Sequence, residues 1–182
     1  MRCIIVNKKS NNKRGQVWVE TVVYTLVGLA ILGLLLAATK PKLDKMRDES
    51  LINQAIESLG VINEKVYEAA QTTGMRVRYD LEIGKGAFYV DGTNNSLYWV
   101  IPSSLKYSEE DIAVNIGTTM TVTTTSADPW QVKIEMPYSK FDIKFDSEDD
   151  VKEYRESGTP YLFTIENEGS VDRILQLNFK QI

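Results

Sequence analysis

The sequence has no histidine and a single cysteine, Cys3, among its 182 residues. A chain without histidine has no Ser-His-Asp or Cys-His catalytic site, no histidine general base and no histidine ligand for a metal ion. One cysteine forms no disulfide within the chain and builds neither a cysteine zinc site nor an iron–sulfur cluster. We therefore expect no catalytic residues, no metal site and no cofactor, and a structural or binding protein rather than an enzyme.

Positive charge is scarce outside the N-terminus. The chain has 21 Lys and Arg against 25 Asp and Glu, for a net charge of −4. The first 15 residues hold five of these basic residues and no acidic one, which leaves 16 basic against 25 acidic residues and a net charge of −9 for the remainder. Contacts to nucleic-acid phosphates need Lys and Arg, so this acidic body disfavours nucleic acid as a partner. The five basic residues are Arg2, Lys8, Lys9, Lys13 and Arg14.

Charge is almost absent from the next segment, where Glu20 is the only charged residue between Gln16 and Thr39. Together with residues 17–19, the uncharged residues 21–39 give an apolar stretch of about 22 residues, or roughly 33 Å as a helix, which is enough to cross a bilayer core. A buried helix of a soluble protein is rarely so long and so uniformly apolar. The apolar part of a cleaved secretory signal is shorter, about 7–15 residues, although residues 36–39 offer a weak version of its cleavage site. We therefore expect residues 16–39 to span a membrane.

The basic residues that flank this segment indicate its orientation. Five precede it and four follow it, and an excess of Lys and Arg favours the cytoplasmic side. The count slightly favours a cytoplasmic N-terminus and an extracellular body. The four that follow are Lys40, Lys42, Lys45 and Arg47.

Glu20 is the most informative residue of the apolar segment. A carboxylate in an apolar helix costs about 2.5–3.5 kcal/mol at the bilayer centre and less near an end. Glu20 is therefore either close enough to the interface to stay hydrated or compensated by a cation. An α-amine created by cleavage four residues upstream would supply that cation.

The residues from Lys13 to Glu20, followed by the uncharged helix, resemble the precursors of type IV pilins, and most closely the archaeal class III signal peptide. The resemblance implies that a prepilin peptidase recognises Lys13 and Arg14 and cuts between Gly15 and Gln16. It also implies that the new chain begins with Gln and carries Glu at its fifth position, as Gln16 and Glu20 do here. The basic leader, residues 1–15, is then removed and the apolar helix is retained.

The same resemblance implies that residues 16–39 serve first as a membrane anchor and then as the core of a surface filament. Glu20 would neutralise the mature N-terminal amine of its own or a neighbouring subunit, and this pairing favours one helix register because an unpaired buried charge is expensive. The small residues Gly28, Gly33 and Ala37 would allow close helix packing. The implied partners are the prepilin peptidase, other pilin subunits and membrane lipid.

Residues 40–74 are expected to continue as an amphipathic helix. Pro41 is expected to kink the helix or to separate two segments, because proline has no N–H to donate. Apolar residues then recur at three- and four-residue steps, and Gly74 is a plausible C-terminal stop. These apolar positions are Leu43, Met46, Ile52, Ala55, Ile56, Leu59, Ile62, Val66 and Ala69.

Residues 75–182 are expected to form a β domain. Apolar residues alternate with charged ones over residues 76–83, and residues 87–90 and 97–101 flank a turn-forming sequence, as in a hairpin. About eight strands with turns every 8–12 residues predict an antiparallel sandwich. Residues 147–157 are expected to form a short acidic helix or a loop, and residues 168–170 to form the last turn. The predicted fold class is α+β: a long N-terminal transmembrane, pilin-type helix followed by a β-sandwich-like domain.

The β domain itself carries few signals of chemistry. The acidic residues 146–150 are interpreted as a solvated loop rather than a calcium site, because their spacing is not that of an EF-hand. Trp99 and Trp130 are more typical of a sandwich core than of a carbohydrate-binding face. Asn94 begins an N-glycosylation sequon, Asn94-Asn95-Ser96, in the expected hairpin turn.

Three functions remain open from the sequence. The first is a structural subunit of a type IV pilus-like surface filament, with a β domain that serves adhesion or the filament surface. The second is a single-pass, membrane-anchored binding module that does not form filaments. The third, a surface enzyme, is disfavoured by the missing histidine and the absence of a catalytic motif.

Processing gives the first testable prediction. Protein isolated from its native membrane should begin at Gln16 and be lighter than the full chain by about 1.7 kDa, because the peptidase removes the basic leader and leaves the helix. Intact mass and N-terminal sequencing measure this directly. A chain that still begins at Met1 would indicate an uncleaved signal anchor and would leave Glu20 without its proposed partner.

Overall fold

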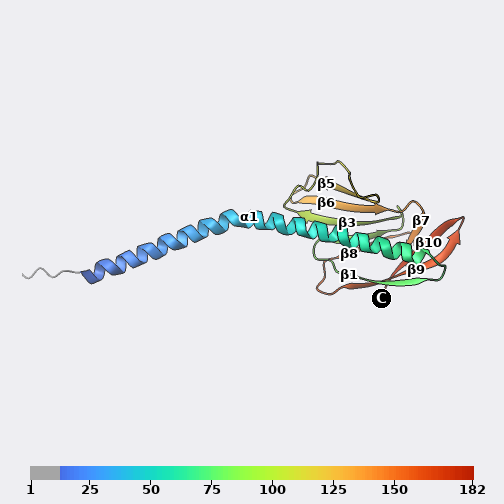
Figure 1. Cartoon of the computed structure of the whole chain (residues 1–182), viewed down its shortest axis with the longest axis horizontal. Helices are drawn as coiled ribbons and strands as arrows, with labels where there is room; N and C mark the ends of the chain where they lie inside the picture. The colour runs from blue at the N-terminus through green and yellow to red at the C-terminus, as the bar shows by residue number, and fades with distance from the viewer. Residues whose placement is uncertain (1–12) are drawn as a thin grey trace, which may run out of the picture. The chain divides into compact units, whose positions relative to one another are not determined.

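The computed structural model describes residues 13–182, with side chains from Trp18 onward. The chain divides into two compact units, Met1–Leu43 and Asp44–Ile182. Arg2, Cys3, Lys8 and Lys9 lie outside the described residues. A single helix, α1 (Lys13–Ala70), belongs to both units (Figure 1), because the division falls within it.

Helix α1 is continuous through Pro41, so the expected separation into two segments is not found. The helix continues although Pro41 removes one backbone donor and its ring crowds the carbonyl of Ala37. The expected amphipathic pattern is confirmed from residue 52 onward, where one face is fully buried: Ile52, Ala55, Leu59, Ile62, Val66 and Ala69 are at most 2% exposed. Leu43 and Met46, expected on the same face, are instead 62% and 59% exposed.

The helix ends at Ala70, close to the expected stop at Gly74. Gly74 has φ +82°, a left-handed conformation that glycine adopts without the steric cost of a side chain. Its N–H donates to the carbonyl of Asn167 at 2.8 Å. The buried Asn167 also donates from Nδ2 to the carbonyl of Ala69 at 3.0 Å, so a strand residue satisfies a helix-end acceptor.

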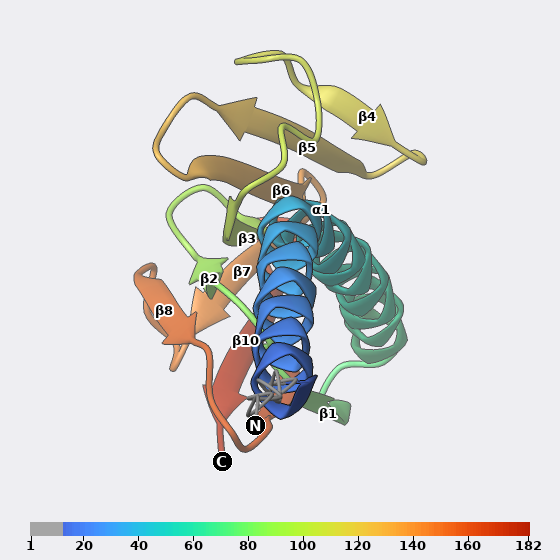
Figure 2. The same cartoon turned by 90° about the vertical axis from the view of Figure 1, so that its left-hand side faces the viewer.

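Ten strands follow among the described residues and form two sheets (Figure 2). The six-stranded sheet has the order β4-β5-β6-β3-β2-β8, and the four-stranded sheet has the order β1-β9-β10-β7. The strands are β1 (Arg76–Leu81), β2 (Ala87–Asp91), β3 (Ser96–Ser103), β4 (Val114–Ile116), β5 (Met120–Thr125), β6 (Trp130–Pro137), β7 (Phe141–Phe145), β8 (Val151–Arg155), β9 (Tyr161–Val171) and β10 (Ile174–Gln181).

The pairing confirms much of the expected β pattern. The predicted hairpin of β2 and β3 is present and antiparallel, and β1 pairs antiparallel with β9. The sheets are antiparallel except for one pair, β7 and β10, which run parallel. The architecture is therefore α+β, with a long N-terminal helix followed by two mostly antiparallel sheets.

Two local expectations were wrong. Residues 151–155 form an edge strand paired with β2 rather than a helix or loop. Only Tyr154 of this strand is buried, so its sequence lacks the alternation of apolar and polar residues that predicts a strand. The last turn lies at Asp172 and Arg173, whose φ values of 49° and 70° suit a tight hairpin turn. Gly169 lies within β9 instead, opposite Gln176, next to a register shift that marks a bulge.

One hydrophobic core joins the helix to both sheets. The buried stripe of α1 belongs to the same cluster as Trp99 and Ile134 of one sheet and Phe163 and Leu177 of the other. Trp99 is 3% exposed and donates from its indole nitrogen to the carbonyl of Lys85 at 3.0 Å, so it is a core residue as expected. Residues 52–69 of α1 are therefore part of the body and not a linker.

The β2–β3 turn also ties the two sheets together. Asn95 Oδ1 accepts a hydrogen bond from the backbone N–H of Ile143, in β7, at 2.7 Å. A Cβ added at Gly92 would lie 3.0 Å from the carbonyl oxygen of Ile143, which is closer than side chains normally approach. Glycine at position 92 therefore permits this contact between the sheets.

The buried stripe of α1 gives a prediction about stability. Leu59→Ala should lower the free energy of unfolding by about 2–5 kcal/mol, because it removes a fully buried side chain and leaves a cavity. Val61→Ala is the matched control, since Val61 is 46% exposed on the same helix, and its effect should stay within about 0.5 kcal/mol. Urea unfolding followed by near-ultraviolet circular dichroism measures both. Equal losses in the two variants would contradict the placement of this stripe in the core.

Candidate functional site

The first candidate site is the exposed part of α1. Every residue from Trp18 to Arg47 is exposed, and Asp48 is the first buried one. Many of these residues are large and apolar, and Trp18, Tyr24, Leu34 and Leu36 are each about 70% exposed or more. Soluble monomers rarely expose continuous apolar surface on this scale. By length and composition, this part of α1 can cross a membrane and is suited to act as an anchor.

Threonine hydroxyls within this segment bond to the helix itself. Thr25 Oγ1 donates to the carbonyl of Thr21, and Thr39 Oγ1 donates to the carbonyl of Leu35 at 2.9 Å. A hydroxyl bonded to a backbone carbonyl four residues earlier needs no water, so it can enter an apolar environment at low cost. The segment is therefore suited to lipid or to the apolar faces of other helices.

Glu20 is exposed and is the only carboxylate within residues 16–39. Residues 13–20 are helical, so positions 16 and 20 lie on the same face, one turn apart. An α-amine at residue 16 would therefore be within reach of the Glu20 carboxylate in the same chain. The side chains of Lys13, Arg14 and Gln16 lie outside the described part of the structure.

The small residues expected at an assembly surface do not all share one face. Gly33 and Ala37 are one turn apart, and Ala30 lies close to both on the helical wheel. Gly28 is about 140° away from Gly33, at 100° per residue, and so points elsewhere. A Cβ added at Gly28 or Gly33 would meet no atom within 4 Å, so neither glycine is required by packing within this chain. Glycine lowers helix stability by about 1 kcal/mol relative to alanine.

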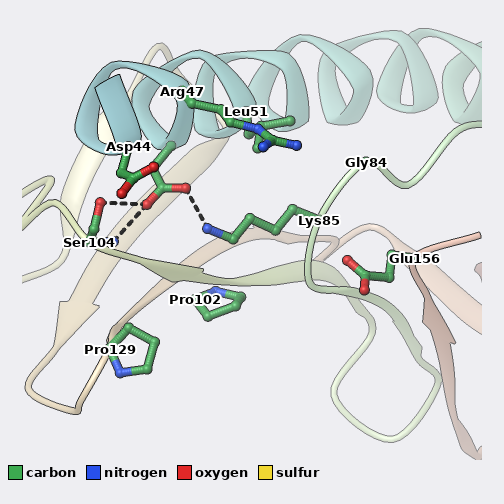
Figure 3. A pocket seen from close by; sticks show the side chains of 10 residues that line it. Asp44, Arg47, Leu51, Gly84, Lys85, Pro102, Ser104, Pro129 and Glu156 are labelled. Atoms are coloured by element: carbon green, nitrogen blue, oxygen red, sulfur yellow. Dashed lines mark hydrogen bonds and ion pairs between the residues drawn. The ribbon is translucent and has the colours of Figure 1, made fainter. Parts of the chain in front are cut away.

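The second candidate site lies where burial of α1 begins, and Figure 3 shows it from close by. Asp48 is 5% exposed, and its Oδ1 accepts an ion-paired hydrogen bond from Lys85, just before β2. Its Oδ2 accepts bonds from the backbone N–H and the Oγ of Ser104, just after β3, each at 2.7 Å. The carboxylate thus joins the helix to both ends of the β2–β3 hairpin.

These contacts determine the protonation of Asp48. Burial by itself raises the pKa of a carboxyl group, but the hydrogen bonds from Lys85 and Ser104 and the Lys85 charge outweigh burial and hold the pKa of Asp48 below its ordinary value. Asp48 is therefore ionised at neutral pH. Loss of one partner would leave a buried charge poorly compensated.

A cleft of roughly 500 Å³ lies beside Asp48 (Figure 3). Its walls include the apolar Leu51, Pro102 and Pro129. The charged residues of both signs that line it include Arg47 and Glu156. Because the lining carries both positive and negative charges, the cleft does not favour a ligand of one charge sign. The contacts of Asp48 beside the cleft hold the helix against the β2–β3 hairpin.

The sequence offered a signal for Asp48 that the hydrophobic pattern concealed. Asp48 lies four residues before Ile52 and so continues the buried stripe by one helical turn. A polar residue in a buried stripe needs hydrogen-bond partners. Lys85 and Ser104 are far away in the sequence, so those partners emerge only from the fold.

The remaining expectations fall on the β body. Asn94 is exposed in the β2–β3 turn, where its Nδ2 donates to Asp91 Oδ2 at 2.8 Å. Ser96 of the sequon is only 2% exposed, so the folded turn does not present the complete acceptor sequence. Within the acidic segment, Asp149 forms an ion pair with Lys144 at 3.4 Å. Across the side chains that the structure describes, no group of three or more His, Cys, Asp or Glu is placed to hold a metal ion.

Comparison with protein-family models, with curated proteins and with solved structures found no match to this chain.

Asp48 gives a prediction that depends on pH. Asp48→Asn should lower the free energy of unfolding by about 1–3 kcal/mol at neutral pH, because it replaces a charged acceptor of three hydrogen bonds. The folded pKa of Asp48 is depressed, so this contribution is present above the unfolded pKa and is lost as the pH falls through the folded pKa.

Urea titrations at neutral and acidic pH measure this difference. The gap between wild type and Asp48→Asn should narrow in acid, whereas Glu49→Gln, an exposed neighbour, should change stability little at either pH. A gap that is independent of pH would show that the ionised carboxylate is not what stabilises this contact.

Proposed function

We propose that this chain is a structural, pilin-like subunit that is processed after Gly15, anchored by residues 16–39 and assembled through α1 into a type IV pilus-like surface filament. The observation that carries the proposal is the exposed apolar surface of residues 18–36 on a helix whose later turns form the core of the body. An apolar surface of this size needs a cover. Lipid covers it before assembly, and the same segment of other copies covers it in the filament.

Glu20 supports assembly rather than simple anchoring. A lone carboxylate adds nothing to a membrane anchor and costs free energy when it leaves water. After cleavage before Gln16, each subunit would bring one carboxylate and one amine to the same turn of the helix. Pairing these charges would favour helices aligned in one register over slipped ones.

The face that contains Ala30, Gly33 and Ala37 supports close helix contact. Neither glycine of the exposed segment is required by the chain's own packing, although both reduce helix stability. In a membrane, where the hydrophobic effect does not drive helices together, small residues let two helix backbones approach closely. This face is therefore the proposed contact surface between subunits, and Gly28 lies outside it.

A membrane-anchored binding module without filaments is the alternative. It is favoured by the distribution of the apolar residues, because Leu34, Leu35 and Leu36 are all exposed and point in three directions around the helix. Lipid covers such a surface on every side. In this alternative the body acts as a single extracellular domain.

Replacement of Glu20 separates the two functions. Glu20→Gln keeps the size of the side chain and removes its charge, so we expect correctly processed subunits in the membrane and at least about a tenfold loss of surface filaments, corresponding to about 1.4 kcal/mol per contact. Electron microscopy of cells and N-terminal sequencing of the membrane fraction measure the two outcomes.

Glu57→Gln is the matched control, because Glu57 is an exposed glutamate of the same helix within the body. This variant should assemble normally. Filaments that form equally well with Glu20→Gln would contradict the role of Glu20, and the absence of filaments in the wild type would favour the anchored module.

A further inference from the structure

A pocket in the body combines aromatic rings with polar side chains that have no hydrogen-bond partner among the described residues. It has a volume of about 340 Å³ and lies between the exposed side of α1, the β4–β5 turn and the loop from β6 to β7. Tyr67 comes from the helix, Thr118 and Thr119 from the turn, and Ser139 and Lys140 from the loop. The pocket is formed entirely by residues of the second unit.

Aromatic side chains make the apolar part of this pocket. The rings of Tyr67 and Phe141 meet edge to face with centroids 5.3 Å apart, and the ring of the buried Tyr138 lies 6.0 Å from that of Phe141. Phe141 packs against the ring of Tyr67, which stays 45% exposed and offers an apolar platform to a ligand. Such platforms suit the C–H face of a sugar ring.

Several polar side chains surround the rings of this pocket. Five of these polar groups make no hydrogen bond or ion pair with any described residue. They are the hydroxyls of Tyr67, Thr118, Thr119 and Ser139 and the amine of Lys140. Of the described residues that line the pocket, Lys140 alone is charged. Hydroxyls and one cation in a pocket with an aromatic ring complement a ligand that carries several hydroxyls and one negative charge.

We propose that this pocket binds a sugar residue that carries a carboxylate, such as a uronic acid in a surface polysaccharide. The ring of the sugar stacks on Tyr67, its hydroxyls bond to the threonine and serine hydroxyls, and its carboxylate pairs with Lys140. The inference deepens the adhesive part of the proposed function and rests on the proposed extracellular position of the body.

The test uses the full chain in micelles of a zwitterionic detergent without a sugar headgroup. Methyl β-D-glucuronide is titrated and followed by saturation-transfer difference NMR, and methyl β-D-glucoside serves as the neutral probe of the same shape. The glucuronide should bind more tightly than the glucoside, and the difference should shrink at high salt because screening weakens an exposed charge pair.

Variants test the residues. Lys140→Gln should weaken binding of the glucuronide by about three- to fivefold and leave the glucoside unchanged, as expected for one exposed ion pair. Tyr67→Leu, which keeps apolar bulk without a ring, should weaken binding of both sugars by about tenfold. Lys45→Gln is the matched control, since Lys45 is an exposed lysine that does not line the pocket, and it should change neither affinity.

Failure to bind either sugar, equal binding of both, or an equal loss in Lys140→Gln and Lys45→Gln would overturn the proposal. Thermal unfolding of each variant shows that the body remains folded. Because binding is measured on isolated subunits, a negative result does not contradict the proposed processing and filament assembly. Conversely, a loss of filaments in Glu20→Gln does not contradict sugar binding.

Discussion

The structure depends on a change in the surface of one helix at Asp48. Before this residue every described side chain of α1 is exposed, and from Ile52 onward one face is buried in a core shared with both sheets. Asp48 marks the change with a buried carboxylate that accepts hydrogen bonds from Lys85 and Ser104. The second half of α1 is therefore an integral part of the body, whereas the first half keeps its apolar side chains exposed.

That division gives the two halves of the helix different physical requirements. Leu59 and its buried neighbours stabilise the body through loss of apolar surface from water. Residues 18–39 present mostly apolar side chains, and the hydroxyls of Thr25 and Thr39 bond back to the helix backbone, which suits lipid or other helices. No loop separates the halves, since α1 is continuous from Lys13 to Ala70.

Local patterns predicted the elements whose signals are local. The apolar spacing of residues 52–69, the hairpin of β2 and β3 and the stop at Gly74 follow from periodicity and turn chemistry. Features that depend on residues distant in the sequence could not be predicted. Only Tyr154 of β8 is buried, so the strand has no alternating pattern. Gly169 was assigned to a turn, although it lies next to a bulge in β9. The contacts of Asp48 and the aromatic pocket around Tyr67 join segments that are far apart in sequence. The roles of Glu20 and Gly33 in assembly stay predictions from the sequence, because they rest on the cost of a carboxylate and of a glycine in an apolar helix.

The central claim is that the exposed segment of α1 is covered by the same segment of other copies. Cys3 is the single cysteine of the sequence and precedes the proposed cleavage site. A chain cut at that site would contain no cysteine, so a single introduced cysteine would report its own contacts. Ala37→Cys in surface filaments, treated with a mild oxidant, should yield disulfide-linked dimers, whereas Lys152→Cys on the edge strand β8 should yield few. An Ala37→Cys chain that stays monomeric, with its thiol free to react in the membrane fraction, would contradict the account and leave α1 as an anchor surrounded by lipid.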